Sequence, residues 1–329
     1  QNARAAKVLQ AEQRFALTGT PVENRLGELW SIFDFLMPGL LGTRDSFAKR
    51  FESPVEHAEG DSAARLQALV SPFVLRRVKE EVVADLPEKI EDTVMAQLTG
   101  EQRKLYLANQ DRIAQQVQHR EASEFKKNKL KVLAELTKLR QICCDPHLHY
   151  ADYKAGSAKL DTCMELVHGA LDGGHRSLLF SQFTGMLDII GKRLAKEDIA
   201  FLKLTGASSK ESRAKMVAQF QAGEVPVFLI SLKAGGVGLN LTAADVVIHY
   251  DPWWNVAAQD QATDRAHRIG QQHTVTVYKL IAKDTIEERI MQMQESKRDL
   301  VNSVLGGDGI SSALFTREDV LALLGGDGR

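Results

Sequence analysis

Residues 227–240 read VFLISLKAGGVGLN, a short apolar run followed at once by a glycine-rich segment. The run Val227–Ser231 has the length of a strand that is buried on both faces. Between residues 176 and 281, similar runs alternate with amphipathic helical patterns, and these runs are Ser177–Ser181, Phe201–Thr205, Val246–Tyr250 and Val275–Ile281. Strands that alternate with helices form parallel sheets. We therefore predict an α/β fold in which helices cover both faces of a parallel sheet.

The segments that flank this region are expected to be largely helical. From the start of the chain to about residue 83, one short strand at Phe15–Thr18 is expected to precede helices. Thr99 and Gln102 have the spacing of a capping box, and apolar side chains then recur at helical intervals up to Cys143. A last helix is expected to begin at Thr285.

The composition narrows the functional class. The 329 residues suffice for about two domains of ~150 residues. The 42 Lys and Arg residues balance 43 Asp and Glu residues, so any contact with nucleic acid must come from local patches. Three cysteines are too few for a disulfide scaffold and indicate a reducing compartment. No apolar run approaches the ~18 residues of a membrane span, so no membrane partner is expected.

Polar and glycine-rich segments follow the expected strands. They are 181–184 (SQFT), 205–206 (TG), 231–240 (SLKAGGVGLN) and 251–255 (DPWWN). In an open parallel sheet, ligands bind beyond the carboxyl ends of the strands. The order of the strands alone therefore predicts a binding site at one edge of the sheet.

The glycine-rich segment is a candidate for handling phosphate. Gly235, Gly236 and Gly238 allow backbone N–H groups to approach an anion closely. The segment is not a Walker A loop, because no Gly-Lys-Ser/Thr follows it, and Leu241 stands where a dinucleotide fingerprint has its third glycine. A simple tight turn is the alternative interpretation.

Arg265 and Arg268 are three residues apart, a spacing that places them on one face of a helix. Two guanidinium groups presented together suit a polyanion such as a triphosphate. The alternative is a structural pairing of one arginine with Asp264 or Asp260.

Three further features each have a functional and a structural interpretation. In the pair Trp253–Trp254, one ring is expected in the core and one exposed, which suits either packing or contact with nucleic acid. The segment 143–149 (CCDPHLH) suggests zinc ligands, but the apolar stripe that leads into Cys143 favours packing of the thiols in a core, and no metal site is predicted. The basic run 126–131 is interpreted as a solvated helix face rather than a phosphate-binding patch.

Taken in order, these segments resemble the C-terminal half of the motor in the Swi/Snf family of helicase-like ATPases (superfamily two). The resemblance is carried by 17–24 (LTGTPVEN), 75–79 (LRRVK), 86–89 (LPEK), 139–143 (LRQIC) with Pro146, 180–183 (FSQF), 231–241 (SLKAGGVGLNL), 251–255 (DPWWN) and 264–271 (DRAHRIGQ). It spans the chain from about residue 1 to residue 297.

The resemblance implies a domain organisation. Residues 1–85 correspond to the helical end of a first RecA-like lobe. Residues 86–282 correspond to the second RecA-like lobe, with a helical protrusion at 99–150. Residues 283–329 correspond to C-terminal helices.

The resemblance also assigns roles to residues. It implies arginine fingers at Arg265 and Arg268, nucleotide binding by Gly236, Gly238, Asn240 and Gln261, DNA binding by Gln182, Thr205, Gly206, Ser231, Lys233 and Trp254, and coupling between lobes by Thr18, Gly19 and Thr20.

For the full-length protein, the resemblance implies a DNA-dependent ATPase that translocates on double-stranded DNA and remodels protein–DNA complexes. Its cofactors would be ATP and Mg²⁺. The Walker A lysine and the acidic metal motif precede Leu17 in this family and do not occur here, so this chain alone is expected to bind neither cofactor and to lack turnover. The expected partners are double-stranded DNA and RNA polymerase or another DNA-bound protein.

A monomeric, cytoplasmic, nucleoid-associated bacterial protein is expected, because the short ending after Lys297 resembles bacterial members; a eukaryotic source would place it in the nucleus. Two alternatives stay open. An RNA helicase of the same superfamily usually reads Gly-Arg-x-Gly-Arg where this chain has 267–271 (HRIGQ). A non-catalytic docking module would have no need of the arginine pair.

Overall fold

The computed structural model describes residues 2–18, 26–53, 61–75, 86–118, 122–235, 239–253, 256–293 and 317–325. The chain divides into two compact units. One contains most of residues 1–78, and the other is built on residues 79–253 and 258–292.

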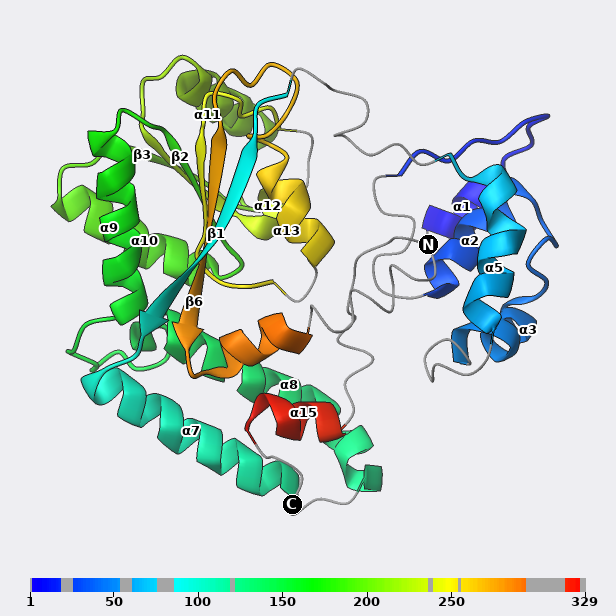
Figure 1. The fold of residues 1–329 in the computed structure, drawn as a ribbon, viewed down its shortest axis with the longest axis horizontal. Helices are drawn as coiled ribbons and strands as arrows, with labels where there is room; N and C mark the ends of the chain where they lie inside the picture. Colours follow the sequence, from blue (N-terminus) through cyan, green and yellow to red (C-terminus); the bar gives the residue numbers. More distant parts are fainter. Residues whose placement is uncertain are drawn as a thin grey trace. The chain divides into compact units, whose positions relative to one another are not determined.

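The larger unit contains a six-stranded sheet in which all neighbouring strands are parallel (Figure 1). The strand order is β1-β6-β5-β2-β4-β3. The strands are β1 (Lys89–Gln97), β2 (Ser177–Ser181), β3 (Phe201–Leu204), β4 (Val227–Ser231), β5 (Val246–His249) and β6 (Val275–Lys283). The predicted α/β fold with a parallel sheet is confirmed, and the five strands expected between residues 176 and 281 are all present.

Helices cover both faces of the sheet, as predicted. On one face, α9 (Ala158–Asp172) and α10 (Thr184–Lys196) pack against alternate strand residues such as Leu179, Leu229 and Ile248. On the other face, α11 (Lys210–Gln221), α12 (Leu232–Gly235) and α13 (Val256–Thr263) meet the intervening residues, such as Leu178 and Phe228. Because successive strand residues point to opposite faces, the continuous apolar runs supply two cores at once.

Strand β1 was not predicted. It lies at the edge of the sheet and pairs with β6, from Lys89 opposite Val275 to Gln97 opposite Lys283. Most of its side chains are exposed, and Glu91 forms ion pairs with Lys89 and Lys279. A strand of this composition has no continuous apolar run, so the pattern that revealed the five inner strands is absent.

Two long helices, α7 (Gly100–Gln118) and α8 (Ala122–Cys144), follow β1 and confirm the expected helical segment (Figure 1). The 3₁₀ turn η3 (Pro146–Leu148) and the short helix α15 (Arg317–Leu323) pack against them. The expected capping box is wrong. The amide of Gln102 is buried, donates to the carbonyl of Ile142 and accepts from the backbone N–H of Ala158.

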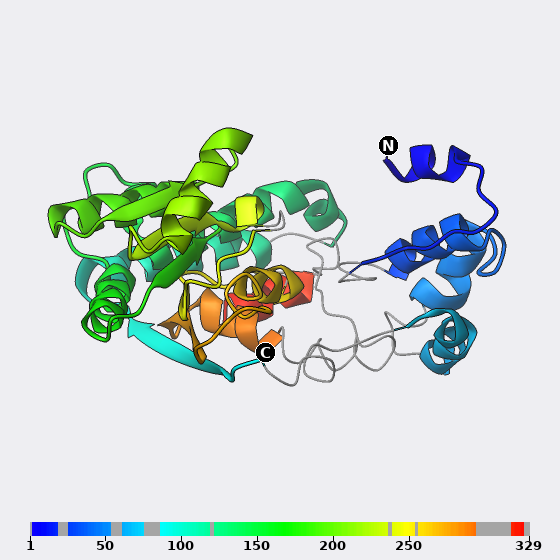
Figure 2. The same cartoon turned by 90° about the horizontal axis from the view of Figure 1, so that it is seen from above.

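The regular structure described in the smaller unit is helical, as expected (blue to cyan in Figures 1 and 2). The helices are α1 (Asn2–Val8), α2 (Leu26–Leu36), α3 (Arg44–Phe47), η1 (Ala48–Glu52), α5 (Ser62–Val70) and η2 (Ser71–Phe73). Their core is formed by residues such as Phe33, Phe47 and Leu66.

The strand expected at Phe15–Thr18 is not formed. These residues adopt no regular structure, and the side chains of Phe15 and Leu17 are 79% and 99% exposed. A strand needs a neighbour for its backbone hydrogen bonds, and the described part of this unit contains no other strand. The expectation of a helix after Thr285 is confirmed for residues 286–293, where Ile286 and Ile290 are buried.

Candidate functional site

The carboxyl ends of the inner strands bring the predicted polar segments to one edge of the sheet. Ser181 at the end of β2 lies opposite Ser231 at the end of β4, and Phe180 lies opposite His249 of β5. Leu204 of β3 lies opposite Ile230 of β4. The segments that begin at residues 182, 205, 232 and 250 therefore leave the sheet together.

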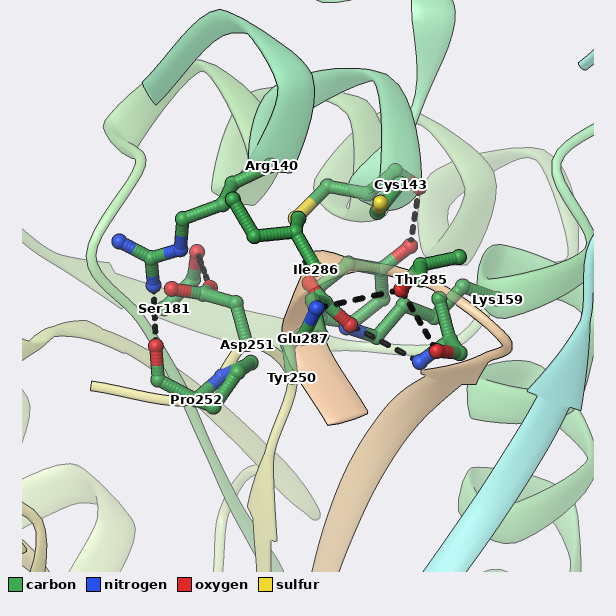
Figure 3. A network of polar contacts seen from close by, with 12 residues as sticks. Arg140, Cys143, Lys159, Ser181, Tyr250, Asp251, Pro252, Thr285, Ile286 and Glu287 are labelled. Atoms are coloured by element: carbon green, nitrogen blue, oxygen red, sulfur yellow. Dashed lines mark hydrogen bonds and ion pairs between the residues drawn. The ribbon is translucent and has the colours of Figure 1, made fainter. Parts of the chain in front are cut away.

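Polar contacts join the segment after β2 to the segment after β5. The Ser181 hydroxyl donates to the carboxylate of Asp251 (Figure 3). The backbone N–H of Gln182 donates to the second oxygen of that carboxylate at 3.3 Å. Asp251 is completely buried. The buried carboxylate of Asp251 thus joins the two segments.

Three of the residues expected to bind DNA have described side chains that differ in burial. Gln182 and Thr205 are half-buried, whereas Ser231 is 3% exposed. Gly206 is exposed. Lys233 lies in α12, which begins directly after β4. Trp254 lies outside the described residues, and its neighbour Trp253 is half-buried and packs against the core cluster of the α11 face.

Part of the expected nucleotide site and of the coupling segment also lies outside the described residues, namely Gly236, Gly238, Gly19 and Thr20. Asn240, Gln261 and Thr18 are described, and all three are exposed.

The arginine segment does not continue helix α13, so the expectation that Arg265 and Arg268 share a helix face is wrong. The helix ends at Thr263, and the chain then turns through Gly270, which has a φ of 99°. The last carbonyls of the helix, those of Ala262 and Thr263, accept from the backbone N–H groups of residues 265–267, and the amide of Gln271 donates to the carbonyls of Ala266 and Ala244. The segment is also tied to the end of the glycine-rich loop, because the N–H of Leu241 donates to the carbonyl of Arg265 at 2.9 Å.

Arg265 and Arg268 nevertheless influence one another. Arg265 is 8% exposed, and its Nε atom is buried with no hydrogen-bond partner among the described residues. Burial lowers the pKa of Arg265, and the positive charge of Arg268 lowers it further, although Asp264 opposes both effects. Arg268 itself is exposed. A buried guanidinium whose donor has no hydrogen-bond partner is costly, because the group loses its contact with water without compensation.

Comparisons with known proteins match two regions of this chain to described domains. Residues 1–148 match the SNF2-related domain, and residues 158–270 match the helicase conserved C-terminal domain. The solved C-terminal domain of the SWI2/SNF2 ATPase of Sulfolobus solfataricus is 32% identical to this chain, with a TM-score of 0.59, and the match covers 72% of this chain and 98% of that domain.

This chain belongs to the Swi/Snf family. The Sulfolobus solfataricus SWI2/SNF2 ATPase core in complex with double-stranded DNA is 38% identical, with a TM-score of 0.58, over 92% of this chain and 65% of that one. A protein of Mycoplasma pneumoniae described as an uncharacterized ATP-dependent helicase is 40% identical over 97% of this chain and 30% of its own length. The chain spans about a third of the length of such curated relatives.

The RecA-like fold expected from the family resemblance is thereby confirmed, with its parallel sheet covered by helices on both faces. None of the described helices combines the length and apolar character needed to cross a bilayer. Within the same described residues, no group of three or more His, Cys, Asp or Glu side chains is placed to hold a metal ion.

The cysteines of this Swi/Snf chain pack in the core, as predicted. Cys143, Cys144 and Cys163 are completely buried, and burial raises the pKa of each thiol, that of Cys163 to about 12. Asp145 accepts a hydrogen bond from the backbone N–H of His147 and begins the turn η3. The segment 143–149 therefore ends α8 and redirects the chain.

Sequence reasoning missed a fully buried ion pair behind the site. Lys159 of α9 and Glu287, which follows β6, meet at 2.5 Å with both side chains 0% exposed (Figure 3). Glu287 also accepts from the backbone N–H of Ala282 at 2.9 Å. Burial lowers the pKa of Lys159, but the charge of Glu287 and the hydrogen bond to it outweigh burial and raise that pKa above its ordinary value.

His249 was also missed, because its only signal in the sequence was a single histidine inside the apolar run 246–250. The imidazole stacks on Phe180, with ring centroids 5.5 Å apart, and Nε2 lies 2.8 Å from the hydroxyl of Thr263. Thr263 is the last residue of α13. His249 therefore joins the end of β5 to the residue from which the arginine segment departs.

We expect His249 to give the chain a measurable acid sensitivity. Burial, aided by Lys279 and opposed by Glu91, lowers the pKa of His249 from 6.5 to about 3. In the unfolded chain the imidazole takes up a proton near pH 6.5, whereas in the native chain it does not do so until about pH 3. The unfolded state thus binds more protons in this window, and stability falls as the pH falls, by at most about 1.4 kcal/mol per pH unit.

Denaturant unfolding of this chain and of His249→Phe between pH 7 and pH 3.5 tests this expectation. The variant should show the shallower loss of stability, because Phe cannot be protonated. Parallel curves for the two proteins would mean that His249 does not contribute to the acid sensitivity.

Proposed function

We propose that the full-length protein is a DNA-stimulated ATPase that translocates on double-stranded DNA and remodels protein–DNA complexes. In this proposal, the present chain supplies arginine fingers and contacts to the DNA backbone. The observation that carries it is Arg265, whose buried guanidinium has an unused donor beside the exposed Arg268. Membership of the Swi/Snf family supplies the context in which such a pair meets a nucleotide.

The described residues fit a nucleotide phosphate, because the unpartnered Nε of Arg265 needs an anion. Arg265 and Arg268 would hold the terminal phosphates, with Asn240 and Gln261 near them and Gly236 and Gly238 in the adjoining loop. Bound ATP would supply the phosphoryl group that is transferred to water, with Mg²⁺ neutralising its charge. The role of this chain is to place two positive charges where negative charge develops.

The DNA assignment rests on the shared edge of the sheet. Gln182, Thr205, Gly206, Ser231 and Lys233 all lie at or just beyond the carboxyl ends of β2, β3 and β4, and Trp254 belongs to the segment after β5. Contacts to phosphate carry no sequence information, so DNA binding should be independent of sequence. The solved relative in complex with double-stranded DNA favours duplex DNA over the RNA helicase alternative.

A direct test uses the full-length protein with ATP, Mg²⁺ and linear duplex DNA. Hydrolysis should rise on addition of duplex DNA, and the motor should displace a third strand from a DNA triplex. Hydrolysis that responds to RNA and not to DNA would favour the RNA helicase alternative. An absence of hydrolysis with either nucleic acid would favour the non-catalytic docking module.

Lys233→Ala should weaken DNA binding about equally for all sequences. Each lysine that neutralises a phosphate contributes about one unit to the slope of log affinity against log salt, because bound counterions are released. Titrations of full-length protein with duplex DNA at several salt concentrations measure that slope. If the affinity of the parent protein for DNA does not depend on salt, the proposed contacts to the DNA backbone are wrong. If only the slope of Lys233→Ala is unchanged, Lys233 does not contact a phosphate, and the other proposed contacts stand.

A further inference from the structure

Arg140 is buried beneath the two segments that are proposed to face DNA. It lies near the C-terminal end of α8 and is 1% exposed, although its side chain is one of the largest in the core. One guanidinium nitrogen donates to the side-chain oxygen of Gln182 at 3.2 Å, and another donates to the carbonyl of Pro252 (Figure 3). The group also lies 5.8 Å from the ring centroid of Phe183. All three partners belong to the segments that follow β2 and β5.

The contact with Gln182 determines which way that amide faces. A guanidinium has donors only, so the atom that meets Arg140 must be the oxygen Oε1 of Gln182. The amide nitrogen of Gln182 is therefore the remaining group, and it has no hydrogen-bond partner among the described residues. An unused buried donor needs an explanation. A phosphate oxygen, which only accepts hydrogen bonds, is the chemical complement of this donor.

The two segments do not depend on Arg140 for their basic attachment. The carboxylate of Asp251 already joins them through Ser181 and the backbone of Gln182. Arg140 adds a contact to a side chain, and its planar group can reach Gln182 and Pro252 at once, which a single ammonium cannot do. Loss of Arg140 should thus release the Gln182 amide without releasing the strand ends.

We propose that Arg140 is a positioning residue for DNA binding. It fixes the orientation of the Gln182 amide, so that the buried and unpartnered NH₂ group is the part of the side chain left to donate to a backbone phosphate when DNA binds. It also holds the adjoining Pro252 segment in register with that amide. Arg140 is too deeply buried to touch DNA itself. This inference rests on the proposed function, because it requires Gln182 to contact duplex DNA.

The test measures duplex DNA affinity, and the DNA concentration that half-stimulates ATP hydrolysis, in full-length protein. Arg140→Met should weaken affinity about ten-fold, the scale of one hydrogen bond to a charged group, with little change in hydrolysis without DNA. Arg140→Lys should have an intermediate effect, and it decides the outcome if the Met variant does not fold. Thr137→Ala is the matched control, since this exposed residue of α8 bonds to the Leu133 carbonyl of its own helix.

Substitutions of Gln182 separate positioning from a merely structural role. In Gln182→Glu, a carboxylate keeps the bond to Arg140 but offers phosphate no donor, so the variant should stay as stable as the parent while binding DNA more weakly than Gln182→Ala. Arg140→Met added to Gln182→Ala should weaken binding little further, because both act through the same amide.

Two outcomes separate the positioning role of Arg140 from the proposed contact of Gln182 with DNA. If Gln182→Ala weakens binding and neither Arg140→Met nor Arg140→Lys does, the positioning role is wrong and the DNA assignment of Gln182 stands. If neither Gln182 variant affects binding, the DNA assignment of Gln182 fails, and the inference about Arg140 fails with it.

Discussion

Arg268→Ala in the full-length protein is expected to slow DNA-stimulated ATP hydrolysis by a factor of about 10³–10⁵, the range for loss of an arginine finger. In the proposed function, the exposed guanidinium of Arg268 stabilises charge that develops on the phosphoryl group, so its removal should affect turnover and spare DNA binding. Steady-state hydrolysis at saturating duplex DNA measures the first quantity, and a DNA titration without nucleotide measures the second. Lys192→Ala, an exposed change on α10, serves as the control. Normal turnover in Arg268→Ala would remove the finger assignment.

Arg265 should respond differently, because it is buried. Arg265→Met is expected to abolish hydrolysis as well, yet to leave the present chain at least as stable as the parent, since the substitution removes a desolvated charge. Denaturant unfolding of the isolated chain gives that comparison. A clear loss of stability would instead identify Arg265 as a structural residue. That result would support the alternative interpretation, in which the arginine pairs with Asp260 or Asp264.

Glu287→Ala should destabilise the isolated chain by about 3–5 kcal/mol, because it leaves the ammonium of Lys159 buried without its partner. The double variant Lys159→Met with Glu287→Leu removes both charges and should recover most of that loss. Equilibrium unfolding in urea measures both changes.

The matched control is the ion pair between Lys203 and Asp188, which also measures 2.5 Å but is exposed. Lys203→Ala should change the free energy of unfolding by less than about 1 kcal/mol. Equal effects of Lys203→Ala and Glu287→Ala would contradict the importance of burial. Failure of the double variant to recover stability would mean that Glu287 acts mainly through the backbone N–H of Ala282.

The inner strands could be predicted because burial on both faces leaves a direct record in the sequence. Runs such as Val227–Ser231 must be apolar at every position, and the chain order of parallel strands then places their carboxyl ends at one edge. The pattern of apolar runs did not predict the edge strand β1, and it wrongly predicted a strand at Phe15–Thr18. Whether a strand forms depends on a neighbour distant in sequence, which a local pattern does not reveal.

The site could be predicted in its location and only in part in its geometry. The spacing of Arg265 and Arg268 indicated their association, but the helix ends at Thr263, before both residues, and the side chain of Gln271 holds the following turn through the carbonyls of Ala266 and Ala244. The contacts of Arg140 and Lys159 could not be predicted from the sequence either, because their partners Gln182 and Glu287 come from distant parts of the chain. Such pairs depend on the packed sheet and leave no periodic signal.

The pairing of β1 with β6 has a consequence for synthesis. Residues 89–97 emerge from the ribosome long before residues 275–283, their strand neighbour in the described chain. At translation rates of about 5–20 residues per second, this edge segment waits roughly 10–40 seconds for its partner. Nascent chains that stop before residue 275 would carry a row of unsatisfied backbone groups, open to pairing with other chains.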